Sequence, residues 1–184
     1  MKIKPLHIVA LTGLIILAVL FFLWRRNKKI EMDKTLTYFR KHFPKKEADE
    51  LADIFSKYFV WSEFDSPDLP GSGYDNMKPE TMSALVLARQ YTQIPFIINS
   101  AYRTAAHNAK VGGVPNSAHT KGYAVDVSTR GKDDKKMLDA FLRFGFKRIG
   151  VYNTFIHVDK DPNLPQNVAW NNFSSINQIQ NYIA

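Results

Sequence analysis

Two histidines and one aspartate are the residues in this sequence best placed for metal chemistry. After His119, Lys121 and Gly122 form a bend, and an alternating segment then leads to Asp126. Because side chains alternate along a strand, Ala124 and Asp126 would share one face. The bend would turn the chain back, so that the His119 imidazole and the Asp126 carboxylate could converge above the small Ala124.

The second histidine lies in an alternating segment over 155–159. The aliphatic residues of this segment would point into a core, whereas His157 and Asp159 would share the opposite face. Zinc takes nitrogen, oxygen or sulfur ligands, and this chain has no cysteine to supply sulfur. Spacing alone does not pair His157 with His119. The simpler alternative is an isolated histidine that is solvated or hydrogen-bonded.

The elements that must position these residues have an α+β pattern. Pro, Gly, Ser and Asp are concentrated over 62–76, which predicts a loop. We expect a small antiparallel sheet with flanking helices, in which Asn153 and Thr154 form the turn of a hairpin. The expected helices cover 30–43, 45–59, 78–91, 132–144 and 174–182, and the expected strands cover 96–99, 123–127, 148–152 and 155–159.

The N-terminus predicts one transmembrane helix. The stretch from Leu6 to Trp24 contains no Asp, Glu, Lys or Arg, and as a helix it would span roughly the hydrocarbon core of a bilayer. Trp24 and the basic residues after it are typical of a membrane interface. A cleaved signal peptide is the alternative, but its apolar stretch is usually shorter and is followed by small residues. The basic residues are Arg25, Arg26, Lys28 and Lys29.

The chain of 184 residues is long enough for one ordinary domain with a short appendage. We divide it into a membrane anchor with basic flanks over 1–29, a helical stalk or bracing layer over 30–60, and a domain with the candidate metal ligands over 61–184. A net charge of +8 suits an anionic partner such as nucleic acid, an acidic membrane or a cell-wall polymer. The basic residues are scattered and form no recognised nucleic-acid motif, so we expect no nucleic-acid partner.

Around the candidate ligands, the sequence resembles the zinc D-Ala-D-Ala carboxypeptidase family, whose fold is shared with hedgehog-type domains. The resemblance covers roughly 61–160 and consists of an ordered series of motifs with matching spacing. It excludes the apolar N-terminal stretch and the first two expected helices. The matching positions are Ser100-Ala101-Tyr102-Arg103-Thr104, His107-Asn108, Gly112-Gly113, Asn116-Ser117, His119, Gly122, Ala124, Asp126 and 150–159.

The resemblance implies roles for individual residues. His119, Asp126 and His157 would be three ligands of Zn2+, with a fourth position left for water. Arg103 would bind the scissile carbonyl and stabilise the oxyanion, and Ser117 would position the substrate. The implied substrate is a peptide stem or cross-link of peptidoglycan, cut by a metal-activated water at a bond that involves a D-amino acid. The segment 61–184 would then be a zinc peptidase domain.

The sequence departs from the family at the general base. Many relatives carry a carboxylate three residues before the second zinc histidine, or a histidine two residues before it. Here these positions hold Thr154 and Phe155, and neither can take a proton. Asp159 shares a strand face with His157, so we predict that Asp159 is the catalytic base. The alternative is that Asp159 only orients His157.

Two further interpretations stay open at this point. Tyr102, Tyr123 and Tyr152 could line a peptide cleft, with Tyr102 as the predicted substrate contact, or they could be half-buried core residues. A catalytically inactive peptidoglycan-binding module is the alternative to an enzyme, because the usual base is lost.

With the predicted anchor, either a peptidase or a binding module for peptidoglycan would be a single-pass membrane protein. Its domain would face the periplasm or the cell wall, or the protein would be a component of a phage virion or lysis system. The basic flank after Trp24 instead favours a cytoplasmic C-terminal domain under the positive-inside rule, so the orientation is ambiguous.

Overall fold

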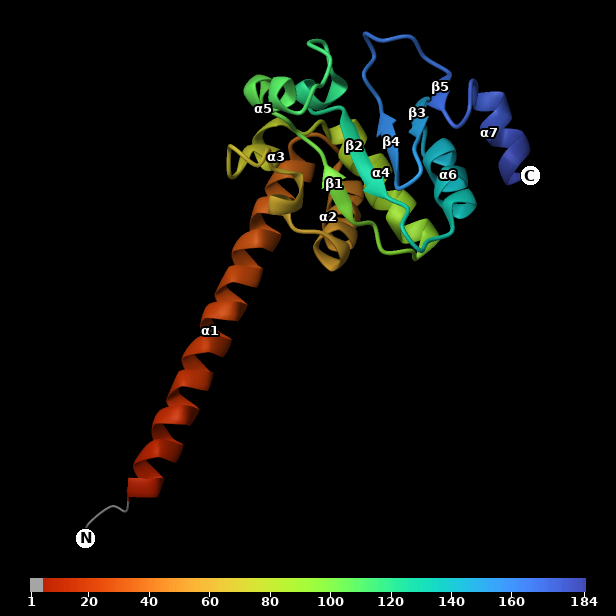
Figure 1. The fold of residues 1–184 in the computed structure, drawn as a ribbon. Coiled ribbons are helices and arrows are strands. Elements are labelled where there is room, and N and C mark those ends of the chain that lie inside the picture. Colours follow the sequence, from red (N-terminus) through yellow and green to blue (C-terminus); the bar gives the residue numbers. More distant parts are fainter. Residues whose placement is uncertain (1–4) are drawn as a thin grey trace.

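The computed structural model describes the backbone of residues 5–184 and the side chains of residues 16–184. A long N-terminal helix leads into a domain in which further helices pack around one sheet (Figure 1). The helices are α1 (Pro5–Arg40), α2 (Lys45–Tyr58), α3 (Ser72–Asn76), α4 (Pro79–Thr92), α5 (Ala105–Lys110), α6 (Asp134–Arg143) and α7 (Ile176–Ile183). Two 3-10 turns are η1 (Trp61–Phe64) and η2 (Ala118–Lys121), and the strands are β1 (Ile98–Ser100), β2 (Ala124–Ser128), β3 (Arg148–Val151), β4 (Phe155–Asp159) and β5 (Val168–Asn171).

The five strands form one sheet in the order β1-β2-β4-β3-β5. Neighbouring strands are antiparallel except for β3 and β5, which run parallel. The predicted α+β class and the mainly antiparallel sheet are therefore confirmed, and β3 and β4 form the expected hairpin. The prediction lacks β5, because alternation over four residues with polar neighbours is too short a signal to separate a strand from a loop.

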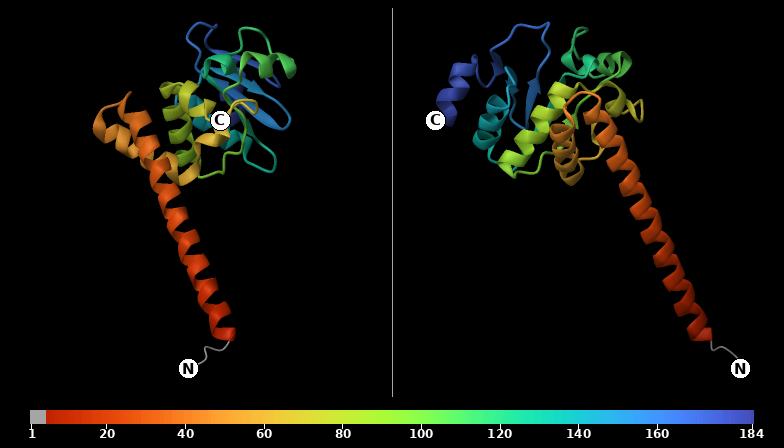
Figure 2. Two further views of the ribbon diagram at one scale, coloured as in Figure 1. Left: turned by 90° about the vertical axis from the view of Figure 1, so that its left-hand side faces the viewer. Right: turned by 180° about the vertical axis from the view of Figure 1, so that it is seen from behind.

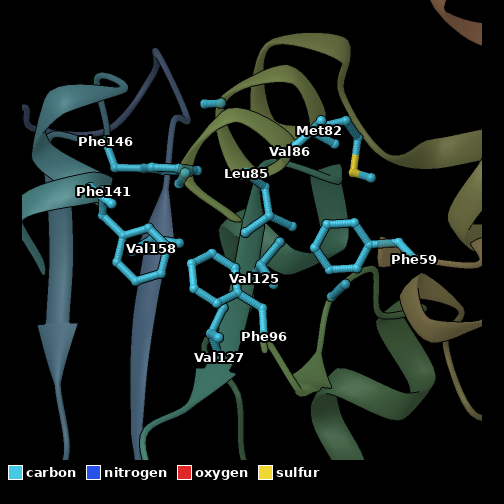
Figure 3. Close-up of a cluster of buried hydrophobic side chains, with 14 of the residues drawn as sticks. Phe59, Met82, Leu85, Val86, Phe96, Val125, Val127, Phe141, Phe146 and Val158 are labelled. Atoms are coloured by element: carbon cyan, nitrogen blue, oxygen red, sulfur yellow. The ribbon is translucent and has the colours of Figure 1, made fainter. Parts of the chain in front are cut away.

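One face of the sheet packs against α4 and α6. Val125 and Val127 of β2 and Val158 of β4 point toward Leu85 of α4 and Phe141 of α6 (Figure 3). All five side chains are fully buried. Since alternate residues of a strand point to opposite faces, this packing leaves Asp126 and His157 on the other face of the sheet. The hydrophobic core thus fixes which side of the sheet carries the polar residues.

The C-terminal part of α1 packs with α2 against the domain. Phe39 of α1 and Phe55 of α2 are buried, and the Phe55 ring stacks on Trp61 with a centroid distance of 4.6 Å. The Tyr38 hydroxyl donates a hydrogen bond to the Met77 carbonyl at 2.8 Å. In the structure, these parts of the predicted stalk or bracing layer over 30–60 are therefore continuous with the hydrophobic core.

The helix α1 runs without a break through the predicted anchor and into the domain, whereas the sequence predicts two separate helices. Figures 1 and 2 show its N-terminal part projecting away from the domain. Within the described part of the chain, we find no helix with the length and hydropathy needed to cross a membrane. The predicted transmembrane helix from Leu6 to Trp24 is not confirmed. Side chains 6–15 of that stretch lie outside the described residues.

The predicted loop over 62–76 contains two short helical elements, η1 and α3. The carboxylate of Asp65 accepts hydrogen bonds from the N–H groups of Gly71 and Gly73 at 2.8 and 2.7 Å. A side chain at Gly73 would collide with the backbone of Phe64, so close packing accounts for the glycine. Such short elements depend on these tertiary contacts, which apolar periodicity does not reveal.

Candidate metal centre

One row of residues crosses all five strands on the face of the sheet opposite α4 and α6. Facing residues on neighbouring strands point to the same side of a sheet, so such a row gathers side chains that are distant in sequence. From edge to edge, the row is Ser100, Asp126, His157, Gly150 and Trp170. The register of the strands therefore places the carboxylate of β2 directly beside the imidazole of β4.

His119 reaches this row from the 3-10 turn η2. The Ser117 hydroxyl caps the turn by accepting a hydrogen bond from the His119 N–H at 3.3 Å. Gly122 ends the turn with a φ of 77°, in the left-handed region that favours glycine. A side chain there would also collide with the backbone of Asn76. The bend that the sequence predicts thus leads the chain from His119 into β2.

The side chains of His119, Asp126 and His157 converge. The Oδ1 atom of Asp126 lies 3.3 Å from His119 Nε2 and 2.8 Å from His157 Nδ1. The two ring nitrogens are 3.2 Å apart. Around a tetrahedral zinc ion with bonds of about 2.0–2.2 Å, neighbouring ligand atoms would be about 3.3–3.6 Å apart. The three donor atoms are therefore close enough together to share one ion.

These three side chains line an open cleft of about 500 Å3. Arg103, Ser117 and Asp159, which the sequence also predicts as site residues, line the same cleft. Tyr102 does not, because its side chain is partly buried against the hydrophobic core. The other residues of the lining are Val114, Asn116, Ala118, Arg148, Tyr152, Phe155, Leu164 and Trp170.

A comparison with protein families agrees with this geometry. The family model described as Peptidase M15 matches residues 57–159, which is more than half of the chain and includes all three residues of the candidate metal-binding triad, His119, Asp126 and His157. The chain belongs to the Peptidase M15 family. The family that the motifs indicate is thereby confirmed at this level, while no individual curated protein matches the chain.

M15 peptidases are zinc enzymes, and the donor atoms of this chain suit that metal. The Nδ1 atom of His119 lies 2.6 Å from the Ala101 carbonyl oxygen, and that oxygen can only accept a hydrogen bond. The proton of neutral His119 is therefore on Nδ1, and the Nε2 lone pair faces the triad. On His157, Nε2 contacts Asp159 at 3.1 Å, which leaves Nδ1 to face the triad in the same way. Such outer partners orient metal-binding histidines in proteins.

The electrostatics of the triad favour one bound proton when no metal is present. Burial lowers the pKa of His119, although Asp126 opposes this effect. Burial would also lower the pKa of His157, but hydrogen bonds to Asp126 and Asp159 raise it to about 9. Burial tends to raise the pKa of Asp126, but the two histidines hold it well below its usual range. At neutral pH, His157 of this M15 peptidase would thus carry a proton that a metal must displace.

Arg103 contacts the triad through Asp126. Its Nη2 donates to Asp126 Oδ2 at 2.7 Å, and its Nε donates to the Ser100 hydroxyl at 2.7 Å. The carboxylate therefore presents one oxygen to the histidines and the other to the guanidinium. A guanidinium has five N–H donors, so this pairing leaves donors for the cleft that Arg103 also lines. The geometry is compatible with the predicted oxyanion contact, which stays a prediction.

A second row, two residues along the strands, contains Ala124, Asp159 and Arg148. Asp159 is almost completely buried, and Arg148 Nε lies 2.9 and 3.0 Å from its two oxygens. The Asp161 N–H donates to Asp159 Oδ1 at 3.1 Å. The opposite end of the guanidinium donates to the Pro165 carbonyl. Asp159 is therefore held by two fixed donors besides His157.

Two residues at the β3–β5 side of the site, Arg148 and Trp170, are not among those that the sequence predicts as site residues. Arg148 pairs with Asp159, and Trp170 lies over Gly150, where any side chain would collide with the indole. The Trp170 and His157 ring centroids are 5.3 Å apart. Alternation within β3 could have indicated that Arg148 and Gly150 share a face. The partner strand of Trp170 could not be inferred without β5.

Proposed function

We propose that the protein is a zinc peptidase that hydrolyses peptide stems or cross-links of peptidoglycan, at a bond that involves a D-amino acid. The observation that carries this proposal is the convergence of His119, Asp126 and His157 in the wall of an open cleft. Membership of the Peptidase M15 family supports the reaction class. The peptidoglycan substrate rests on the motif resemblance.

The chain's own residues have separate tasks in this proposal. His119, Asp126 and His157 would hold zinc, which supplies a Lewis acid and lowers the pKa of a bound water toward about 7. Arg103 fixes the outer oxygen of Asp126 and offers its remaining N–H donors to the carbonyl oxygen of the bond that is cut. Ser117 holds the turn that carries His119 and lines the cleft where the substrate would bind.

For Asp159, the hydrogen bonds favour orientation of His157 over the role of general base. A base must accept a proton from a water in the cleft, which needs a free lone pair aimed at that water. Arg148 and the Asp161 N–H already donate to Asp159, and its Oδ2 faces His157 Nε2. The catalytic role of Asp159 stays a prediction, and separate measurements of zinc affinity and turnover distinguish the two roles.

A catalytically inactive peptidoglycan-binding module is the second candidate. Thr154 and Phe155 occupy the positions that carry the base in many relatives, and the carboxylate of Asp159 is engaged by Arg148. Such a protein would keep the cleft and the metal-binding triad without turnover.

The test is mass analysis of purified peptidoglycan fragments after incubation with the full chain, with zinc content measured on the same sample. Zinc-dependent appearance of new peptide ends identifies the bond that is cut. His119→Ala should abolish both zinc binding and cleavage. His42→Ala is the matched control, because His42 is exposed and lies outside the cleft. Fragment binding without new peptide ends would establish the inactive module.

We also propose that the N-terminal helix contacts a lipid bilayer and that the domain acts in the periplasm or at the cell wall, in a cell or as part of a phage. Leu20, Phe21 and Phe22 are more than half exposed on α1, and the basic run that begins at Arg25 follows them. This pattern supports contact with an anionic membrane. Cosedimentation with anionic vesicles should be lost in Leu20→Asp/Phe21→Asp, and equal sedimentation of both proteins would refute the proposal.

A further inference from the structure

Three aromatic side chains that contact one another, those of Tyr152, Phe155 and Trp170, line the cleft that Arg103 also lines. The Tyr152 ring stacks on Phe155, with a centroid distance of 4.2 Å and an angle of 10° between the rings. Trp170 lies over Gly150, and its Nε1 donates a hydrogen bond to the Tyr152 hydroxyl at 3.1 Å. Residues from two strands and one hairpin turn therefore hold the Tyr152 hydroxyl in place.

The hydrogen bond from Trp170 determines what the hydroxyl can still do. An indole N–H can only donate, so the Tyr152 oxygen is the acceptor. The hydroxyl hydrogen then has to point toward a different acceptor. Within the described residues, the hydrogen bond from Trp170 is the one that this hydroxyl makes. Tyr152 thus brings an unused donor to the lining of the cleft.

The position of this donor indicates which part of a substrate it would meet. The Trp170 ring contacts both His157, at a centroid distance of 5.3 Å, and the Tyr152 hydroxyl, at 3.1 Å from its Nε1. The hydroxyl is therefore no farther from the His157 ring than these two contacts and the width of one indole allow. An extended peptide advances about 3.3–3.6 Å per residue. A peptide cut at the triad would thus present a backbone carbonyl to Tyr152 within about three residues of the scissile bond.

We propose that Tyr152 is a substrate-binding residue that donates a hydrogen bond to a backbone carbonyl of the bound peptide, and that Trp170 is the positioning residue that aims it. This inference rests on the proposed function, because it assumes that the cleft receives a peptide of peptidoglycan. Since the contact is remote from the reacting bond, it is made equally in the ground state and the transition state. Its loss should therefore raise KM and leave kcat unchanged.

The experiment compares Tyr152→Phe with the wild-type chain on soluble disaccharide–peptide fragments prepared from peptidoglycan. Kinetics on the zinc-loaded protein give kcat and KM, and calorimetry on the metal-free protein gives Kd for the fragments without turnover. Tyr152→Phe should raise KM and Kd by about 3–10-fold, as expected for one lost hydrogen bond, with kcat within about twofold of wild type. Tyr91→Phe is the matched control, since Tyr91 is exposed on α4 outside the cleft.

A double-mutant cycle tests the part played by Trp170. Trp170→Phe keeps a ring over Gly150 but removes the N–H that orients the hydroxyl. It should raise Kd by less than Tyr152→Phe, and the double variant should bind no more weakly than Tyr152→Phe alone. Additive losses would overturn the positioning role, because they would show that Trp170 acts independently of Tyr152. Thermal denaturation of each variant identifies any general loss of folding.

The outcomes separate this inference from the proposed function. Cleavage by the wild-type chain combined with an unchanged Kd for Tyr152→Phe overturns the inference and leaves the function intact. A fall in kcat with an unchanged Kd overturns it as well, because the contact would then belong to the transition state. If the wild-type chain binds fragments without cutting them, a Tyr152-dependent Kd supports the inference and the peptidase function fails. If it neither binds nor cuts, both fail.

Discussion

His157 lies between two aspartates that look alike but have different surroundings. Asp126 contacts one ring nitrogen at 2.8 Å, and Asp159 lies 3.1 Å from the other. Each carboxylate is paired with an arginine, Arg103 on one side and Arg148 on the other. The two aspartates differ in what else reaches their oxygens, so the same residue type can have different roles at two ends of one imidazole.

The remaining contacts separate the two roles. Asp126 Oδ1 also faces His119 Nε2 at 3.3 Å, so one oxygen is directed at the point where two histidine lone pairs meet. Asp159 instead accepts a hydrogen bond from the backbone N–H of Asp161, and no second histidine is near it in the described structure. We therefore expect the β2 carboxylate to bind metal and the β4 carboxylate to orient a ligand.

Asp126→Asn should have the largest effect, and it is the strongest test of the different roles of the two aspartates. It removes the anionic oxygen from the triad and brings an amide toward two imidazoles. Zinc affinity should fall by more than the 10–100-fold that loss of an outer partner costs, and peptidase activity should vanish. Zinc titration calorimetry on the metal-free protein measures the change. The control is Asp53→Asn, because Asp53 is exposed on α2. Zinc binding of wild-type strength by Asp126→Asn would remove the distinction between the aspartates.

Arg103→Ala should have the next largest effect, and it acts on turnover. The family resemblance implies that Arg103 stabilises the oxyanion that develops in the transition state. Removal of one such donor costs about 10²–10³-fold in kcat. At saturating zinc the stoichiometry should stay at one ion per chain, because the three ligands remain. Stopped assays with metal analysis measure both quantities. Unchanged turnover would show that Arg103 serves only to fix the Asp126 carboxylate.

Asp159→Asn should have a smaller effect, and it tests whether Asp159 orients His157 or acts as the general base. As an orienting partner of His157, Asp159 contributes about 10–100-fold to zinc affinity, and kcat at saturating zinc should change little. If Asp159 is the general base, the substitution should leave zinc affinity nearly intact and lower activity by about 10²–10⁴-fold. Measuring the zinc Kd and kcat on the same preparation decides between these patterns. A collapse of kcat with wild-type zinc affinity would establish the base.

Much of the fold and of the triad could be predicted from sequence, because these features depend on local patterns. Alternation over 155–159 predicts that His157 and Asp159 share a face, and both lie on the cleft side of β4. The glycine bend after His119 is also visible in the sequence. The motifs, rather than spacing, connected His119 with His157, since these residues meet only through the register of β2 and β4.

The parts that could not be predicted depend on long-range pairing. The sequence contains Arg148, but its contact with Asp159 exists because these residues face each other across β3 and β4. Trp170 reaches the site on a four-residue strand whose only partner in the described sheet is β3. Tyr102 belongs to a family motif, yet its side chain packs against the core. A motif thus identifies a position in the chain, while strand register determines which side chains meet.

The last prediction needs no substitution: zinc binding should release one proton. Because the two aspartates raise the pKa of metal-free His157 to about 9, zinc must displace a proton below that pH. Zinc affinity should rise by up to about tenfold per pH unit from pH 7 and level off near pH 9.

The stability that the raised pKa gives the metal-free protein is complete below the unfolded pKa of about 6.5 and is lost as pH rises toward 9. Calorimetry in buffers of different ionisation enthalpy counts the proton, and Asp159→Asn should shift the plateau to lower pH. A flat affinity between pH 6.5 and 9 would show that His157 does not carry this proton, so that the two carboxylates do not act on it jointly.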